Sequence, residues 1–260
     1  MVEDNALNQL VAEGVVTKLG YHVDIVHNGA EALNAIARTF YSAVLMDCHM
    51  PVMDGFAATE EIRRRGGDDA IPIIAMTAGA MAEDRDRCLA VGMNDYVSKP
   101  VNVSAVSEAL ARWARTSPAD AADAAAVSTT VGAPVQLVSP TGDDRLLDAA
   151  RQQLLRELGP DDGQGILPAA VEAFLTDAPQ IVAALRLAVA TGDARRFGEA
   201  VHQLKGAAAN IGVIKVFELC QTVKDGGTGR AAPDGALVDR LEAELDRAGP
   251  ALHAALEPAR

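Results

Sequence analysis

The sequence predicts two structural classes in one chain, an α/β domain with a doubly wound parallel sheet followed by an all-α helical bundle. Strand-like and helix-period segments alternate up to about residue 115, which is the pattern of a doubly wound sheet. Residues 117–142 are rich in Ala, Ser, Thr, Pro and Asp without a sustained period, as in an interdomain linker. We therefore expect domains over residues 1–116 and 143–260, joined by this linker.

The first domain is expected to contain nine elements. Its strands are nearly continuous apolar runs, which is typical of parallel strands covered on both faces. In chain order we expect a helix over 7–15, a strand at 23–26, a helix over 29–37, a strand at 43–47, a helix ending near 65, a strand at 71–77, a helix reaching 88, a strand at 96–97 and a helix over 103–113.

The second domain has only helical periods. Apolar residues recur there at steps of three and four, so that the helices can share one bundle core. One such stripe consists of Phe197, Val201, Leu204, Ala208 and Ile211. The expected helices cover residues 146–158, 169–190, 194–210, 213–224 and 237–256.

Charge and cysteine content exclude several classes of protein. The net charge is −13, with 10 basic against 16 acidic residues before residue 117 and 13 against 20 after it. Nucleic-acid binding requires a basic face, so nucleic acid is not an expected partner. The three cysteines show no CxxC spacing, which argues against a disulfide framework or structural zinc and favours a reducing, cytoplasmic location.

Neither a membrane span nor a signal peptide is expected. The longest charge-free apolar stretch, residues 70–82, is about 13 residues long and contains Pro72 and Gly79. A membrane-spanning helix needs about 20 apolar residues. The first residues also lack a basic segment followed by an apolar one.

Acidic residues and one lysine stand at the ends of predicted strands. Asp47 ends the strand at 43–47, Glu3 and Asp4 follow the first apolar residues, and Lys99 follows the strand at 96–97. Carboxylates gathered at the carboxyl edge of a sheet require a cation, and hard oxygen ligands suit Mg²⁺. If Asp47 attacks a phosphoryl group, Mg²⁺ and Lys99 neutralise the developing charge, and the hydroxyl of Thr77 can contact a phosphoryl oxygen.

These residues belong to an ordered set of motifs. The set comprises Glu3-Asp4, Asp47 with the tail Met50-Pro51-Val52-Met53-Asp54-Gly55, Thr77-Ala78, Tyr96 and Lys99-Pro100. Residues 1 to about 115 thereby resemble the receiver domain of two-component response regulators. The resemblance implies a flavodoxin-like sheet with strand order 2-1-3-4-5.

The resemblance also implies a role for each matching residue. Asp47 would be the phosphoacceptor, and Glu3, Asp4, Asp47 and the backbone carbonyl of His49 would hold Mg²⁺. Lys99 would contact the phosphoryl group and precede a cis peptide bond, which is costly except before proline. Thr77 and Tyr96 would move together on phosphorylation.

The first strand departs from the receiver pattern. Only Met1 and Val2 precede Glu3, although this strand is central in the expected sheet. A truncated central strand leaves neighbouring backbone groups unpaired. We therefore expect that the chain is a fragment or has a misassigned start, as in the tail of a hybrid histidine kinase.

A second constellation occurs in the distal half, at His202-Gln203-Leu204-Lys205-Gly206, with Asn210 and Gly212 following. On a helix, His202 shares one face with Gly198, Gly206 and Ala209. Glycine within a helix costs about 1 kcal/mol relative to alanine, so two beside one histidine indicate close approach of another active site. Lys205 can balance phosphoryl charge, although a surface lysine that merely snorkels is the ordinary alternative.

Residues from about 145 to 257 resemble a histidine phosphotransfer (HPt) domain. The resemblance implies that His202 is the phosphohistidine and that Lys205 and Gly206 are its neighbours. Glycine-rich ATP motifs of a histidine kinase are not found in the sequence. The chain is therefore expected to be a phosphotransfer intermediate rather than a kinase.

The predicted function is a phosphorelay in which a histidine kinase phosphorylates Asp47 and His202 exchanges phosphate with the aspartate of a response regulator. One alternative is a haloacid-dehalogenase-like, Mg²⁺-dependent phosphohydrolase. That class needs a second Asp two residues after the nucleophile, where this sequence has His49. Another alternative is a non-catalytic docking module whose phosphate is a sink.

Overall fold

The computed structural model describes residues 1–66, 71–77, 82–114, 146–159, 165–223 and 233–257. The chain divides into two compact units. The first combines Met1–Asp4 with Val15–Pro140, and the second combines Asn5–Gly14 with Thr141–Arg260. The predicted linker, residues 117–142, lies outside the described residues.

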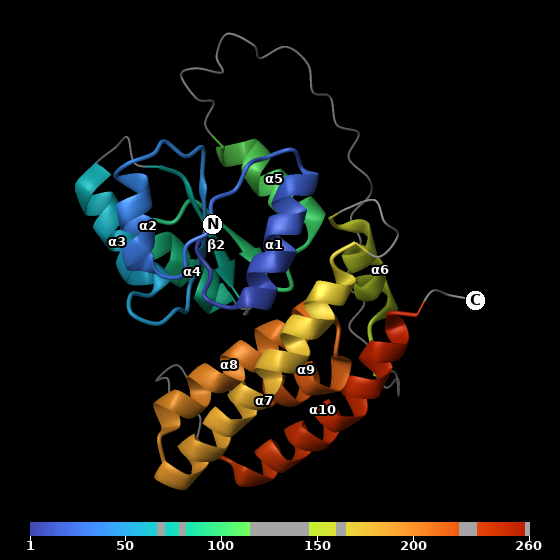
Figure 1. Cartoon of the computed structure of the whole chain (residues 1–260). Helices are drawn as coiled ribbons and strands as arrows, with labels where there is room; N and C mark the ends of the chain where they lie inside the picture. Colours follow the sequence, from blue (N-terminus) through green and yellow to red (C-terminus); the bar gives the residue numbers. More distant parts are fainter. Residues whose placement is uncertain (67–70, 78–81, 115–145, 160–164, 224–232, 258–260) are drawn as a thin grey trace. The chain divides into compact units, whose positions relative to one another are not determined.

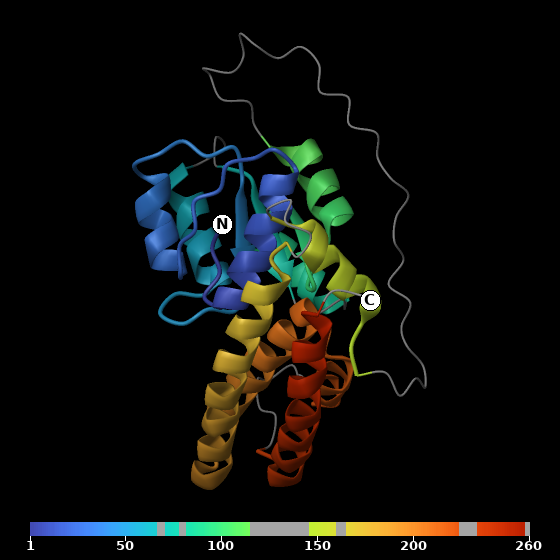
Figure 2. The ribbon, with the colours of Figure 1, turned by 45° about the vertical axis from the view of Figure 1, so that its right-hand side comes forward.

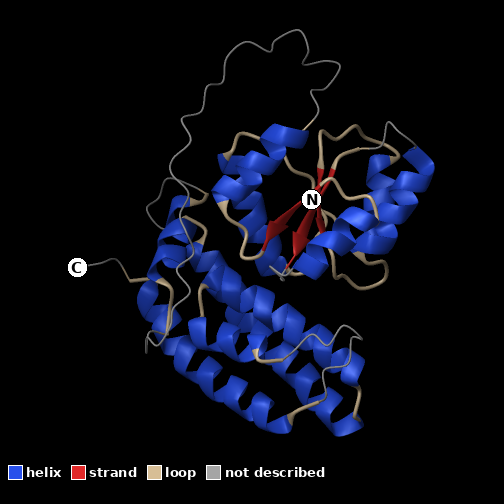
Figure 3. Ribbon diagram, turned by 180° about the vertical axis from the view of Figure 1, so that it is seen from behind, coloured by secondary structure: helices blue, strands red, loops and turns tan. Residues whose placement is uncertain are grey.

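The first unit contains a parallel sheet (Figure 3). Its strands are β1 (Val44–Asp47), β2 (Ile73–Thr77) and β3 (Asp95–Ser98), in the order β1-β2-β3. Val2 adds isolated parallel bridges, one to Met46 of β1 and one to Val26. The backbone order is therefore Val26, Val2, β1, β2, β3, which is the predicted 2-1-3-4-5 order with its first strand truncated.

The strand predicted at residues 23–26 is wrong in extent, because only Val26 pairs with another strand. In this sequence Met1 alone precedes Val2, so residues 23–25 have little neighbouring backbone to pair with. Val2 is nevertheless held firmly against β1 by two backbone hydrogen bonds. Its N–H donates to the carbonyl of Leu45 at 2.8 Å, and its own carbonyl accepts from the N–H of Asp47 at 3.0 Å.

Helices cover both faces of this sheet, with α5 and the end of α1 from Val15 on one side and α2, α3 and α4 on the other (Figure 1). Asn28 caps α2 by accepting from the N–H of Glu31, and Asn102 caps α5 in the same way. Side-chain oxygens of this kind satisfy the free N–H groups at a helix start. The helices are α1 (Ala6–Lys18), α2 (Gly29–Ile36), α3 (Gly55–Gly66), α4 (Ala82–Ala90) and α5 (Val103–Trp113).

The second unit is helical, as predicted, and the five expected helices are confirmed with shifted ends (Figure 2). Aspartates 148, 193 and 234 cap α6, α8 and α10, and Gly192 and Gly212 end α7 and α8 in the left-handed conformation. The helices are α6 (Ala149–Glu157), α7 (Leu167–Thr191), α8 (Ala194–Ile211), α9 (Ile214–Gln221) and α10 (Gly235–Ala255).

Among the described helices, α7 is the one that is long and apolar enough to cross a membrane, by length and composition alone. Its buried residues include Phe174, Ile181 and Leu185, and it packs against α8 and α10. A core helix of a bundle passes the same test of length and composition.

Candidate functional sites

The fold brings the predicted acidic residues and the lysine to one edge of the sheet. Asp47 is the last residue of β1, Thr77 is the last residue of β2, and Lys99 directly follows β3. Glu3 follows the bridging residue Val2, and its N–H donates to the carbonyl of Val26 at 3.1 Å. Because parallel strands place their carboxyl ends together, residues far apart in the sequence meet there.

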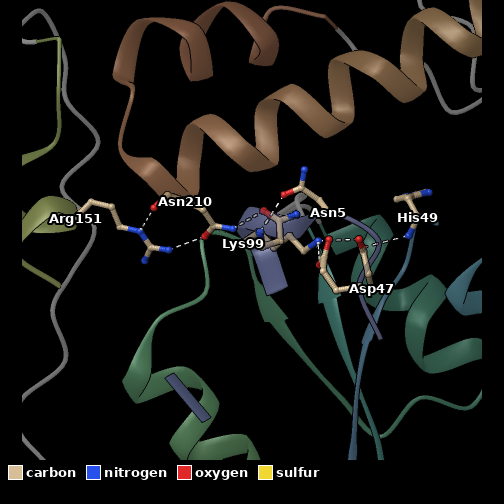
Figure 4. A network of polar contacts seen from close by, with 8 residues as sticks. Asn5, Asp47, His49, Lys99, Arg151 and Asn210 are labelled. Carbon is tan, nitrogen blue, oxygen red and sulfur yellow. Dashed lines mark hydrogen bonds and ion pairs between the residues drawn. The ribbon is translucent and has the colours of Figure 1, made fainter. Parts of the chain in front are cut away.

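Lys99 lies between two carboxylates (Figure 4). Its Nζ donates to Glu3 Oε2 at 2.6 Å and to Asp47 Oδ2 at 2.8 Å, and these three side chains are at most 4% exposed. Burial alone would lower the pKa of Lys99, but the charges and hydrogen bonds of Asp47 and Glu3 outweigh it and raise that pKa above its ordinary value. The site therefore holds a fixed positive charge beside the Asp47 carboxylate.

The acidic side chains also fit a metal ion. Oxygens of Glu3, Asp4 and Asp47 all lie within 4.8 Å of one another. With one ammonium against three carboxylates, the cluster keeps a net negative charge. Hard oxygen donors around a negative cluster suit Mg²⁺, and Asp4 is only half-buried, so water can complete the coordination.

Backbone contacts fix the loop that follows Asp47. The N–H of His49 donates to Asp47 Oδ1 at 3.2 Å (Figure 4), and the N–H of Gly55 donates to the carbonyl of Cys48 at 3.2 Å. A Cβ at Gly55 would lie only 2.1 Å from the carbonyl oxygen of Asp47, so a larger residue cannot occupy that position without a shift. The predicted role of the His49 carbonyl as a metal ligand stays a prediction.

The remaining residues of the receiver motif are in place around this edge. The carbonyl of Thr77 accepts from the N–H of Lys99 at 2.6 Å, and the Lys99-Pro100 peptide is cis, as predicted. Tyr96 is a half-buried residue of β3, and the guanidinium of Arg85 lies 5.4 Å from its ring centroid. The coupled movement of Thr77 and Tyr96 stays a prediction.

His202 lies in α8, as predicted, and its side chain is half-buried rather than fully clear of its surroundings. Phe197, Val201 and Leu204 of the same helix are buried in the bundle core. Lys205 is half-buried close to His202 along the helix. The helix thus anchors one face in the core and presents the histidine on another.

The two glycines beside His202 differ from each other. A Cβ at Gly198 would meet no atom within 4 Å, which agrees with the predicted open approach. Gly206 is buried, and a Cβ there would lie 3.5 Å from Asn8 Nδ2, a residue of the same unit. The prediction of open space at Gly206 is therefore wrong, because a long-range neighbour covers it.

The end of α8 is fixed by a buried arginine that the sequence analysis did not identify. Arg151 donates from Nε to the carbonyl of Asn210 at 2.8 Å and from Nη2 to Asn210 Oδ1 at 2.6 Å (Figure 4). The Nδ2 of Asn210 in turn donates to Asn8 Oδ1 at 2.7 Å. Burial lowers the pKa of Arg151 to about 10, and its charge meets the negative end of the helix dipole.

Gly212, which follows this end, has φ +84, and a Cβ there would lie 3.1 Å from Arg151 Cβ. Asn210 is thus explained by its hydrogen bonds with Arg151, and Gly212 by its positive φ and the nearby Arg151 side chain. Arg151 occupies a position of the apolar stripe shared by Leu155 and Leu158. A charged residue in such a stripe was the signal that could have revealed it.

Comparisons with known proteins match both halves of the chain to domain families. Residues 1–111 match the model of the response regulator receiver domain, and residues 169–250 match that of the Hpt domain. Sensor protein GacS of Pseudomonas syringae pv. syringae is 31% identical over 226 residues, covering 85% of this chain and 23% of that protein. Probable histidine kinase 1 of Oryza sativa subsp. indica is 38% identical over 144 residues, covering 44% of this chain and 15% of that protein.

Solved structures include the receiver domain of a sensor histidine kinase from Pseudomonas aeruginosa, with a magnesium ion in its active-site cleft. It is 46% identical, covers 43% of this chain and 92% of that one, and has a TM-score of 0.40.

The matched domains define a component of a two-component phosphorelay. The chain contains a response regulator receiver domain followed by a histidine phosphotransfer domain. It spans 15% and 23% of the lengths of the two curated relatives described above.

Proposed function

We propose that Asp47 accepts a phosphoryl group from the phosphohistidine of a histidine kinase, and that His202 exchanges this group with the aspartate of a response regulator. The observation that carries the proposal is the buried arrangement of Asp47, Lys99 and Glu3 at the carboxyl edge of the sheet. It places a nucleophilic carboxylate beside a fixed cation and a cluster of metal-binding oxygens.

The proposed reaction forms an acyl phosphate. A carboxylate oxygen of Asp47 attacks the phosphorus, the N–P bond of the donor breaks, and the imidazole leaves with the electron pair and takes a proton. Lys99 balances charge that gathers on the phosphoryl oxygens. Mg²⁺, held by Glu3, Asp4, Asp47 and the His49 carbonyl, would supply further charge neutralisation when bound.

His202 performs the reverse attack on an acyl phosphate. Among the described residues, the cluster of Glu3, Asp4 and Asp47 is the one group of His, Cys, Asp or Glu side chains arranged to hold a metal. That cluster lies in the first unit. The helical unit contributes His202 as the nucleophile, and Lys205 is the nearest cation to it along the helix. We infer that His202 relies on the metal and lysine of the receiver domain with which it reacts.

The proposed partners are a histidine kinase upstream and a response regulator downstream, and the proposed location is the cytoplasm. The Sγ atoms of Cys48 and Cys88 lie 3.6 Å apart without a disulfide bond, and Cys220 is likewise buried outside any disulfide, which supports a reducing compartment.

Transfer between two copies of this chain tests the proposal without an identified partner. His202 of one copy serves as the phosphohistidine donor, and Asp47 of the other copy serves as the receiver aspartate. An Asp47→Ala chain is first phosphorylated on His202 with ammonium phosphoramidate, and the reagent is then removed. This donor is mixed with a His202→Gln chain and Mg²⁺. We expect the phosphoryl group to appear on Asp47 of the second chain, as identified by mass spectrometry. A donor that also carries His202→Gln should transfer nothing.

Two results would contradict the proposal. If the His202→Gln chain stays unlabelled, the two sites do not exchange phosphate. If the phosphoryl group is released as inorganic phosphate and Asp47 of the wild-type chain never passes it to a histidine, a phosphohydrolase or a phosphate sink explains the site better.

A further inference from the structure

The loop after Asp47 contains a backbone conformation that valine adopts rarely. Val52 has φ +68 and is the one non-glycine residue with positive φ in the described part of the chain. The N–H of Met53 donates to the carbonyl of Pro51 at 2.8 Å, so Val52 is the central residue of a three-residue γ-turn. This turn is rare and strained, and a β-branched side chain makes it more so.

Contacts on both sides hold the strained turn in place. The carbonyl of Met53 accepts from the N–H of Gly29 at 3.0 Å. A Cβ at Gly29 would lie 2.6 Å from Ala58 Cβ and 2.8 Å from Met53 Cγ, so the start of α2 is pressed against this loop. The surrounding fold therefore determines the conformation, and strain that persists in this way clusters at functional sites.

The Val52 side chain packs very little against the folded chain itself. It is 88% exposed, more than any other exposed large hydrophobic side chain in the described residues. Glycine would relieve the positive φ, and asparagine tolerates it better than a β-branched residue. An exposed β-branched side chain that the fold holds at a positive φ, five residues after Asp47, is a candidate contact for a partner.

We propose that Val52 is a docking residue that packs against the phosphohistidine-bearing helix of the protein donor. The inference rests on the proposed function, because it concerns the partner of the Asp47 reaction. The helix of this chain's own phosphohistidine shows the complementary chemistry. Gly198 lies one turn before His202, and the space above it is open, so a small apolar side chain of a receiver can approach the bare backbone there.

Two kinds of phosphoryl donor separate docking from chemistry. The acceptors are the His202→Gln chain and the same chain with Val52→Asn or Val52→Gly. The protein donor is the Asp47→Ala chain charged on His202, and the small donor is acetyl phosphate. Because acetyl phosphate needs no docking surface, we expect all three acceptors to react with it at equal rates.

With the protein donor, both Val52 variants should react about tenfold more slowly, as expected when one valine side chain is no longer buried in the transition-state complex. Both variants should also unfold at an equal or higher urea concentration, because the backbone strain is relieved. This result excludes loss of folding as the cause of the slower transfer.

Phe40 offers a matched control. It is 54% exposed and precedes β1, so it lies toward the end of that strand opposite to Asp47. Phe40→Ser in the His202→Gln chain should leave the rates with both donors unchanged.

Equal transfer from the protein donor to all acceptors would overturn the docking role of Val52 and leave the proposed function standing. A parallel loss with acetyl phosphate would also overturn it, because Val52 would then act through the geometry of the site. Absence of transfer even to the acceptor with Val52 intact would instead contradict the proposed function.

Discussion

Asp47 and His202 are proposed to carry the same phosphoryl group in very different surroundings. The Asp47 side chain is buried, bonded to the ammonium of Lys99 and placed among metal-binding oxygens. His202 is half-buried on a helix whose neighbouring turn includes the bare Gly198. The surroundings of Asp47 can stabilise charge, whereas those of His202 leave room for a partner's active site.

This difference indicates how two sites can share one reaction. Charge stabilisation requires burial and fixed dipoles, which restrict access. A helix face with small residues gives access but provides little stabilisation of its own. In each reaction between a histidine and a receiver aspartate, only one partner needs to supply the stabilising charges. We therefore expect substitutions at the receiver site to change the rate of the chemical step. Substitutions near His202 should instead change how closely the partners approach.

The largest expected effect separates the two nucleophiles. Asp47→Asn should lower labelling by acetyl phosphate at least about 100-fold, because the amide oxygen is a poor nucleophile. His202→Gln should leave the labelling of Asp47 unchanged. Phosphate-affinity electrophoresis of both variants measures this, and Asp47→Asn labelled at the wild-type rate would place the acceptor elsewhere.

Removal of divalent metal should distinguish the sites almost as strongly. With EDTA, we expect labelling of Asp47 by acetyl phosphate to fall about 100-fold, because the carboxylate cluster loses its neutralising cation. Charging of His202 by phosphoramidate in the Asp47→Ala chain should not change. Equal sensitivity of both reactions to EDTA would refute the contrast in charge stabilisation.

Lys99→Met should destabilise the first unit by about 3 kcal/mol in metal-free buffer, because Glu3 and Asp47 stay buried without their cation. Added Mg²⁺ should restore part of this loss by binding the folded state. Urea unfolding followed by the fluorescence of Trp113, the single tryptophan, reports on this unit.

Arg112→Met is the control for this variant, since Arg112 forms an exposed ion pair with Asp95 and should matter much less. If Lys99→Met were no more destabilising than this control, the buried ion pairs would not hold the site together.

Arg151→Met should destabilise the second unit by about 2 kcal/mol, because two buried acceptors of Asn210 lose their donors. Hydrogen exchange of the amides in α8 measures the loss. Arg195→Met, which removes an exposed pair with Glu199, should leave this exchange unchanged. Matching exchange in the two variants would show that Arg151 does not anchor the helix.

Gly198→Ala gives the smallest expected effect. Alanine should stabilise α8 by about 1 kcal/mol and meets no neighbour, yet it should slow transfer between His202 and Asp47 a few-fold by covering the backbone. Gly249→Ala in α10, where a Cβ would lie 3.9 Å from Leu175, should stabilise without slowing transfer. Faster or unchanged transfer in the Gly198→Ala chain would argue against an approach surface there.

The sequence predicted the receiver site better than its surroundings. The sequence identified Asp47, Asp4 and Lys99 because strand ends converge on one edge of the sheet. Carboxylates gathered there are stable only beside a cation. The helices of the second unit could be found because their periods are local. Both kinds of inference depend on residues near in sequence or on a repeated geometry of the fold.

Other features depend on contacts that no local pattern carries. Pairing of residues 23–26 requires backbone from the first strand, and the cover over Gly206 comes from Asn8. The partner of Arg151 is 59 residues away. The positive φ of Val52 accompanies a hydrogen bond from Gly29 of α2 to the carbonyl of Met53, which composition does not reveal.

A time course of site-specific labelling tests the relay most directly. The wild-type chain is incubated with acetyl phosphate and Mg²⁺, and mass spectrometry follows the phosphoryl groups on Asp47 and His202 separately. We expect Asp47 to be labelled first and His202 afterwards, and we expect no label on His202 in the Asp47→Asn chain. Labelling of His202 at the wild-type rate in that variant would contradict the relay.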